Sequence, residues 1–184
     1  NFDRTWYIIE VPPPPHFTLA MPLIIVEGPD NSGKSTLIQA LATQLRLPMA
    51  RTYRMPQTEE DIQHWHNWAN AAPYPLILDR HSAISDLIYS PLVRNTSGAS
   101  SLRLASACRN GHYLIYCRPH WDTIAATYHE REQLGGTHEK LTDLIRAYDN
   151  LMDELDPNFI YNWENERALP VLITRLTHAL ERMK

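Results

Sequence analysis

A short segment near the start of the chain has the residue types and spacing of a loop that binds a phosphate chain. Gly28-Pro29-Asp30-Asn31-Ser32-Gly33-Lys34-Ser35 follows the pattern GxxxxGK[ST], directly after an apolar run and directly before a segment with helical spacing. Glycines let the backbone wrap the phosphates with its N–H groups pointing inward, and the helix adds its positive N-terminal end. Lys34 would reach the terminal phosphates and the Ser35 hydroxyl would bind Mg²⁺. The segment therefore predicts a nucleotide site.

A second candidate lies at the end of another apolar run, where Arg80 follows Asp79. At the carboxyl end of a central strand, a carboxylate lies beside the phosphate-binding loop and can hold the water shell of Mg²⁺. Arg80 would face the same crevice and clamp the phosphate of an acceptor. Arg51 and Arg54, which end a further apolar run, are candidates for the same role. A surface ion pair and solvated surface arginines are the alternative interpretations.

Aromatic and histidine side chains gather between residues 53 and 68. Trp65 and Trp68, with Tyr53, could form a wall on which a nucleobase stacks, although aromatics at i and i+3 of a helix are also typical of core packing. His64 and His66 would point to different sides of a helix, and no cysteine is near them in the sequence. We therefore expect no structural zinc site.

These residues need a scaffold, and the apolar pattern predicts one in which strands and helices alternate. Short apolar runs predict strands over residues 23–26, 49–53, 76–79, 113–117 and 159–161. Apolar spacing of i, i+3 and i+4 predicts helices over residues 35–45, 59–69, 84–89, 102–108, 121–130, 140–155 and 169–183. The alternation indicates an α/β fold with a parallel sheet. Residues 90–101, rich in Ser with Pro91 and Gly98, predict a mobile loop.

Composition restricts the class of protein. The chain has 184 residues, 43% of them hydrophobic, which fits one globular domain. A net charge of −4 excludes a protein held on nucleic acid by bulk electrostatics, although the middle of the chain is positive. Cys108 and Cys117 are too few for a disulfide framework, so we expect a reducing, cytoplasmic setting. No apolar run approaches the roughly 20 residues that a bilayer requires, so we expect no membrane partner.

The motifs together resemble those of the P-loop nucleoside and nucleoside monophosphate kinases, most closely thymidylate kinase. The run from Glu27 to Thr36 is similar to the family's EGxDGxGKST, with Asn31 where the family usually has glycine. Asp79-Arg80-His81 resembles the second family signature, but the Ser and Tyr that follow lie one residue farther from the pair. This spacing is similar to that of the compact kinases encoded by tailed bacteriophages, as are Cys117-Arg118-Pro119, Arg131-Glu132-Gln133 and Ala147-Tyr148-Asp149. The resemblance covers residues 22 to about 165.

The resemblance implies a P-loop NTPase three-layer sandwich with a five-stranded sheet, ATP and Mg²⁺ as cofactors, and a role for individual residues. The nucleotide would contact Gly28, Pro29, Asn31, Ser32, Gly33, Lys34, Ser35 and Thr36, with Ser35 and Asp79 at the metal. The catalytic set would be Lys34, Asp79, Arg80, Arg131 and Asp30. The acceptor would contact Asp30, Arg51, Arg54, Trp65, Trp68 and Arg80.

The resemblance also implies a division of the chain. Residues 127–138 resemble the lid that closes over ATP, from which Arg131 would reach the transferred phosphoryl group; a solvated helix end is the alternative. Residues 22–184 would form the kinase domain. Residues 1–21, with a polyproline spacer, form an extension without a counterpart in the family.

Three functions remain compatible with the sequence. The first is transfer of the γ-phosphoryl group of ATP to a deoxynucleoside monophosphate, with dTMP or a 5-substituted pyrimidine relative as first expectation. Such an acceptor needs no general base, because its phosphate, with a second pKa of about 6, is already largely dianionic at neutral pH. The second is a kinase for a hydroxyl, on a deoxynucleoside or on a 5-hydroxymethyl-pyrimidine base in phage DNA. This reaction needs a carboxylate base, with Glu27, Asp30 and Asp79 as candidates.

The third function is a nucleotide-binding switch that transfers nothing, against which the lid-like segment with Arg131 argues. We expect a free nucleotide as the partner, with modified DNA less favoured. Whether the chain forms a homodimer is left open. A phage origin would place it in the host cytoplasm.

Overall fold

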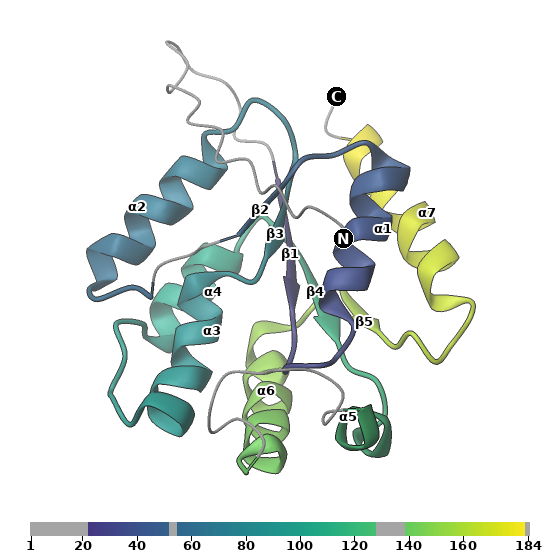
Figure 1. Ribbon diagram of the computed structural model, residues 1–184. Helices are drawn as coiled ribbons and strands as arrows, with labels where there is room; N and C mark the ends of the chain where they lie inside the picture. The colour runs from purple at the N-terminus through teal and green to yellow at the C-terminus, as the bar shows by residue number, and fades with distance from the viewer. Residues whose placement is uncertain (1–21, 52–54, 128–138, 183–184) are drawn as a thin grey trace, which may run out of the picture.

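The chain folds around one parallel β-sheet with helices on both faces (Figure 1). The computed structural model describes residues 22–51, 55–127 and 139–182. The strands are β1 (Leu23–Glu27), β2 (Met49–Arg51), β3 (Leu76–Asp79), β4 (Tyr113–Cys117) and β5 (Phe159–Tyr161), in the order β2-β3-β1-β4-β5. All four pairings between neighbouring strands are parallel. The predicted α/β fold with a five-stranded parallel sheet is confirmed.

The central strand β1 is apolar throughout most of its length because both of its faces are covered. Leu23 and Ile25 pack into one core cluster, whereas Ile24 and Val26 pack into the cluster on the opposite face. β1 pairs with β3 so that Val26 lies opposite Asp79. The carboxyl ends of β1 and β3 therefore meet at one edge of the sheet, from which the loops with the candidate residues leave.

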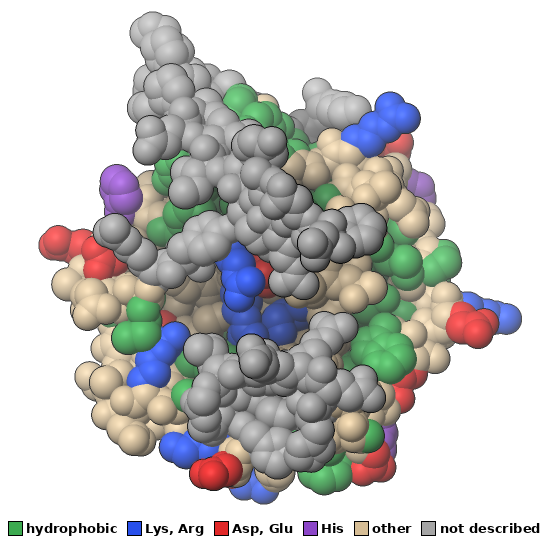
Figure 2. Space-filling model, in the orientation of Figure 1, with side chains coloured by type: hydrophobic (Ala, Val, Ile, Leu, Met, Phe, Trp, Pro, Cys, Tyr) green, Lys and Arg blue, Asp and Glu red, His purple; other side chains and the backbone are tan. Residues whose placement is uncertain are grey.

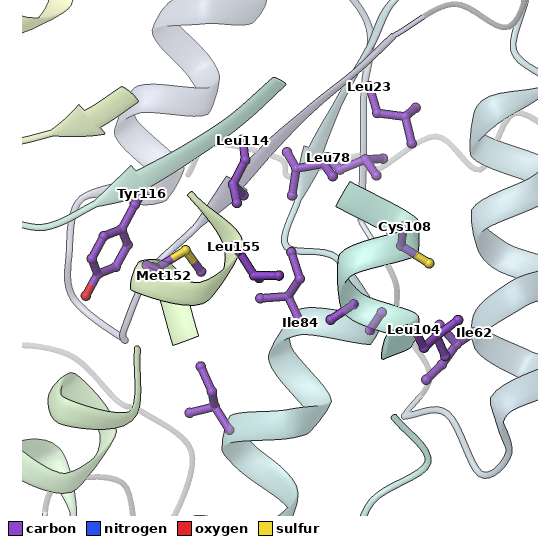
Figure 3. Packing of buried hydrophobic residues seen from close by; sticks show 14 of the residues in the cluster. Leu23, Ile62, Leu78, Ile84, Leu104, Cys108, Leu114, Tyr116, Met152 and Leu155 are labelled. Atoms are coloured by element: carbon purple, nitrogen blue, oxygen red, sulfur yellow. The ribbon is translucent and has the colours of Figure 1, made fainter. Parts of the chain in front are cut away.

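Two layers of helices complete a three-layer arrangement. α1 (Lys34–Leu45) and α7 (Ala168–Glu181) cover one face. α2 (Glu59–Asn70), α3 (Ser82–Tyr89), α4 (Leu102–Arg109) and α6 (Leu141–Leu155) cover the other, where Ile62, Ile84 and Leu104 pack together (Figure 3). α5 (Trp121–Thr127) follows β4, and a π-helical turn, η1 (Ser90–Arg94), follows α3. In the described ranges, none of the helices has the length and apolar character needed to span a membrane.

The helix that follows β3 starts where a histidine side chain caps it. His81 lies in extended backbone, and its Nδ1 accepts a hydrogen bond of 3.1 Å from the backbone N–H of Ala83. This contact satisfies one of the free N–H groups of the first turn, so α3 begins at Ser82, ahead of the predicted residue 84.

The prediction of a loop over residues 90–101 is wrong for residues 90–94, which form a helical turn. η1 covers its first part, and the buried carboxylate of Asp86 anchors the rest. Asp86 accepts hydrogen bonds from the Ser90 hydroxyl at 2.5 Å and from the backbone N–H groups of Ala99 and Ser100 at 2.6 and 3.0 Å. Because a buried carboxylate needs such donors, this contact fixes the segment next to α3.

Some predictions fall on residues that the structure does not describe. These are the extension over residues 1–21, the end of the second predicted strand with Tyr53 and Arg54, and the lid segment over 128–138 with Arg131. They remain predictions.

Candidate active site

The phosphate-binding loop has the left-handed turns that its sequence requires. Gly28, Asn31 and Gly33 have φ angles of +148°, +63° and +87°. A Cβ atom on Gly28 would lie 2.6 Å from the carbonyl oxygen of Cys117, so only glycine fits there. Asn31 stands at a position where the resembling family has glycine, and asparagine is one of the few residues that adopt this conformation readily.

Asn31 also ties the loop to the helix that precedes residues 128–138. Its side-chain amide Nδ2 donates hydrogen bonds to the hydroxyl of Thr127 and, at 3.5 Å, to the backbone carbonyl of Ile124. Both partners belong to α5. The departure from the family motif thus has a structural consequence, since glycine would make the same turn without this contact.

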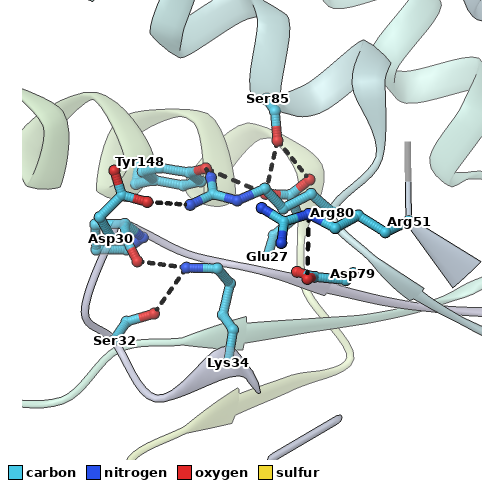
Figure 4. Close-up of polar contacts among 10 residues, drawn as sticks. Glu27, Asp30, Ser32, Lys34, Arg51, Asp79, Arg80, Ser85 and Tyr148 are labelled. Carbon is cyan, nitrogen blue, oxygen red and sulfur yellow. Dashed lines mark hydrogen bonds and ion pairs between the residues drawn. The ribbon is translucent and has the colours of Figure 1, made fainter. Parts of the chain in front are cut away.

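Lys34 is the first residue of α1, and its side chain reaches back across the loop. Its Nζ donates hydrogen bonds to the Pro29 carbonyl oxygen at 2.5 Å and to the Ser32 hydroxyl at 3.4 Å (Figure 4). Burial and the neighbouring Arg80 lower the pKa of Lys34 to about 8. Ser35 and Thr36, which follow it, are exposed on the first turn of the helix. A bound phosphate would give the ammonium group a stronger partner than the carbonyl it contacts.

The carboxylate of Asp79 lies almost buried at the end of β3, beside the guanidinium of Arg51. The Nε of Arg51 is 3.6 Å from Asp79 Oδ2, and the Arg51 side chain is 48% exposed. Ser35 and Asp79 offer hard oxygen donors of the kind that Mg²⁺ prefers, so the residues present fit this cation. Figure 2 shows basic side chains gathered in a hollow over the carboxyl end of β1.

Arg80 is held from three sides. Its guanidinium donates hydrogen bonds to Asp30 Oδ1 and to the Tyr148 hydroxyl, both at 2.6 Å, and lies 4.9 Å from the centre of the Tyr89 ring (Figure 4). Its φ angle of +68° is costly for a residue with a side chain. Backbone strain of this kind is common at functional sites, and here it turns Arg80 toward the phosphate-binding loop.

Glu27 organises the residues around Arg80. Its carboxylate is fully buried and accepts hydrogen bonds from the His81 backbone N–H at 2.7 Å, the Ser85 hydroxyl at 3.1 Å and the Tyr148 hydroxyl at 3.2 Å. Burial raises the pKa of Glu27, whereas Arg80 opposes that rise. Because its donors come from the protein itself, we assign Glu27 a positioning role. Sequence reasoning weighed Glu27 only as a base and gave Tyr148 no role; an acidic residue ending a buried strand was the available signal.

The structure does not bring the two tryptophans into this cluster. Trp65 and Trp68 stack on each other with ring centres 4.6 Å apart on α2. Trp65 packs against the core, and Trp68 is 37% exposed. Their role as a wall for a nucleobase stays a prediction. A different aromatic residue, Trp163, lies against Gly33 of the loop and is 44% exposed.

Comparison with known proteins places this geometry in a known fold. No family model and no curated protein matches the sequence. Among solved structures, the YorR protein of Bacillus subtilis in complex with phosphorylated GDP has a TM-score of 0.66 at 19% identity, covering 88% of this chain and 98% of that one. The chain shares the fold of this structure.

Two further structures have kinase names. Deoxyadenosine kinase from M. mycoides with bound dCTP has a TM-score of 0.54 at 15% identity, covering 85% of this chain and 99% of that one. A gluconokinase from Sinorhizobium meliloti 1021 has a TM-score of 0.51 at 17% identity, covering 90% and 98%. At these identities the likeness extends to the fold, while substrate and chemistry depend on the residues of the site.

Proposed function

We propose that the protein is an ATP-dependent kinase that phosphorylates a deoxynucleoside monophosphate, with dTMP or a 5-substituted pyrimidine relative as the first candidate. The observation that carries this proposal is the position of Arg51 and Arg80. They extend from the ends of the neighbouring strands β2 and β3: Arg51 lies beside the Asp79 carboxylate, and the Arg80 guanidinium points to Asp30 of the loop that also holds Lys34 (Figure 4). Two guanidinium groups at one edge suit the dianionic phosphate of an acceptor.

Each residue has a separate task in such a transfer. The backbone of the phosphate-binding loop and Lys34 would hold the phosphates of ATP, and Lys34 would meet the charge that develops on the transferred group. Mg²⁺, held through Ser35 and the Asp79 carboxylate, supplies neutralisation of phosphate charge when bound. Arg80, fixed by Asp30 and Tyr148, would hold the acceptor phosphate at a constant position.

One observation in the same site, the free carboxylate oxygen of Asp30 among the described residues, favours a hydroxyl acceptor. Asp30 binds Arg80 through Oδ1, whereas its Oδ2 is buried and has no hydrogen-bond partner among the described residues. The Glu27 carboxylate already accepts hydrogen bonds from three groups of the protein, and Asp79 lies where Mg²⁺ is expected. Asp30 is therefore the carboxylate best placed to accept a proton from a deoxynucleoside or from a 5-hydroxymethyl-pyrimidine base in DNA.

A panel of acceptors separates the two functions. Labelled ATP and Mg²⁺ are incubated with the free deoxynucleoside monophosphates, the deoxynucleosides and 5-hydroxymethylated DNA. We expect label on a pyrimidine monophosphate and about a thousandfold loss of transfer in Lys34→Ala. We expect Arg51→Gln to raise the acceptor KM about tenfold or more, because one of two phosphate ligands is lost. Arg103→Gln is the matched control, since among the described residues that arginine pairs with Glu59 alone, at the surface.

Each outcome of the panel decides between the functions. Label confined to DNA or to deoxynucleosides, with transfer abolished in Asp30→Asn, would establish the hydroxyl kinase instead. Hydrolysis of ATP with no acceptor labelled would contradict both.

A further inference from the structure

Away from the phosphate-binding loop, the fold brings together nitrogen and sulfur ligands that are distant in the sequence. His66 on α2, His81 ahead of α3 and Cys108 on α4 each offer a ligand atom, and these atoms lie within 4.8 Å of one another. From the sequence alone we expect no zinc site, because His64 and His66 would point to different sides of a helix with no cysteine near them; the packed fold instead brings His66 together with two residues from other elements. We propose that His66, His81 and Cys108 form a binding site for a thiophilic divalent cation of the Zn²⁺ class.

The donor set selects the class of cation. Two imidazole nitrogens and one thiolate are ligands of Zn²⁺ and similar metals, whereas Mg²⁺ and Ca²⁺ take oxygen. The ligating atoms of this group include no carboxylate. The site is therefore chemically distinct from the oxygen donors of Ser35 and Asp79, and the two sites would take different ions.

The ligand atoms of His66, His81 and Cys108 need to move only a little to reach the spacing found around a tetrahedral Zn²⁺ ion. His66 Nδ1 and His81 Nε2 are 3.1 Å apart, close to the separation of about 3.3 Å that two nitrogens have around a tetrahedral Zn²⁺ ion. The sulfur would have to approach each nitrogen to about 3.6 Å, a shift of about 1 Å from the outer limit of the present spacing. A rotation of the Cys108 side chain supplies a movement of that size. His112, whose ring centre is 5.4 Å from that of His66, or a water molecule would complete the four positions.

The surroundings hold the ligands firmly and still leave an entrance. His81 is fully buried and Cys108 is 3% exposed, so the packing of α2, α3 and α4 holds the backbone of both residues in place while the Cys108 side chain turns. His66 and His112 are only half-buried. A cation would therefore enter from the side of His66 and lose most of its water at Cys108 and His81.

Binding exchanges protons for the cation. In the metal-free protein the Ala83 N–H donates to His81 Nδ1, so the ring proton of His81 is on Nε2 and is donated to His66 Nδ1. The cation takes the place of that proton on Nε2. The proton moves to Nδ1 of His81, which gives up the Ala83 contact, and the thiol proton of Cys108 passes to solvent as its sulfur becomes a thiolate. The lost backbone contact weakens binding, so we expect an affinity below that of a purely structural zinc site.

The test uses the full chain, freed of metal with a chelator and studied without nucleotide, so its result does not depend on the proposed kinase activity. Titration with Cd²⁺ should produce a thiolate charge-transfer band in the ultraviolet with one ion per chain. Cys108→Ser should abolish the band, and His66→Gln should weaken Zn²⁺ binding, measured by chelator competition, at least about tenfold. His64→Gln is the matched control, because His64 is exposed on the same helix; it should bind as the parent does.

A measurement on the unaltered protein covers variants that fail to fold. The X-ray absorption spectrum of the Zn²⁺-loaded chain should show one sulfur at about 2.3 Å and nitrogens at about 2.0 Å. A shell of oxygen and nitrogen alone, a Cd²⁺ band that persists in Cys108→Ser, or equal Zn²⁺ affinity in His64→Gln and His66→Gln would each overturn the proposal.

Discussion

At the scale of single residues, the hydroxyl of Tyr148 connects two charged groups, Arg80 and Glu27, on the side of the site where we propose that the acceptor binds. It accepts from Arg80 at 2.6 Å and donates to Glu27 at 3.2 Å. We expect Tyr148→Phe to lower kcat/KM for the acceptor about 10- to 100-fold, because hydrogen bonds to charged groups contribute about 1.5–3 kcal/mol each. Steady-state kinetics with saturating ATP measures this effect.

The neighbouring tyrosine is the control for that substitution. Tyr116 stacks on Tyr148 with ring centres 6.1 Å apart, and its hydroxyl donates to Asp149 at 2.6 Å, outside the contacts of Arg80. Tyr116→Phe should keep kcat/KM within about threefold of the parent, since its lost bond faces a partly exposed carboxylate. Equal losses in the two variants would mean that packing of the tyrosine pair, and not the position of Arg80, determines the rate.

We expect nucleotide binding to depend on pH through Lys34. Its pKa is lowered to about 8 by burial and by Arg80, whereas the thiol of Cys117 has its pKa raised by burial to about 12 and stays protonated. Phosphates favour the ammonium form and raise the Lys34 pKa when they bind. We therefore expect the affinity for ATP to be complete below pH 8 and to fall as the pH rises through this value.

Titration calorimetry of ATP in the presence of EDTA measures this dependence without metal. The Kd at pH 9 should be about tenfold higher than at pH 7, since about a tenth of Lys34 remains charged there. Adenosine, which has no phosphate, should bind equally at both values. A Kd for ATP that is constant from pH 7 to 9 would show that the buried lysine keeps its proton or does not contact the phosphates.

At the scale of elements, the side chain of Asn31 joins the phosphate-binding loop to α5 through hydrogen bonds. Asn31→Gly keeps the left-handed turn but removes the side-chain contacts to α5, so we expect a loss of about 1 kcal/mol in the free energy of unfolding. Asn31→Ala removes the same contacts and adds about 1 kcal/mol of backbone strain. Urea unfolding of both variants distinguishes the two contributions. Equal free energies of unfolding for Asn31→Ala and Asn31→Gly would contradict a left-handed backbone conformation at residue 31.

The same scale shows how far the sequence determines the structure. The strands could be predicted because β1 is a continuous apolar run buried on both faces, and the phosphate-binding loop because its spacing is specific. The ordered segment after α3 could not, since local composition does not reveal that Asp86 binds Ala99 and Ser100. The bond between Tyr148 and Glu27 joins residues 121 positions apart. Such contacts depend on the packed topology, which no local pattern encodes.

At the scale of the whole molecule, charge bears on the identity of the acceptor. The chain carries a net charge of −4, so its overall field repels a polyanion, while some of its basic side chains lie together in the central hollow of the face in Figure 2. A monophosphate held by Arg51 and Arg80 presents a single phosphate to this hollow. A DNA strand would contact the protein through several of its phosphates and would release a counterion at each contact.

Salt dependence measures how many phosphates the acceptor brings. With ATP saturating and free Mg²⁺ constant, we expect kcat/KM for a monophosphate acceptor to fall less than about fivefold between about 50 and 200 mM salt. An acceptor that contacts six or more phosphates would lose about a thousandfold over the same range. Arg51→Gln should lower the parent's activity without steepening its slope, because it removes one contact to one phosphate. A steep slope with DNA as the labelled acceptor would mean that the local basic hollow outweighs the negative field of the whole protein.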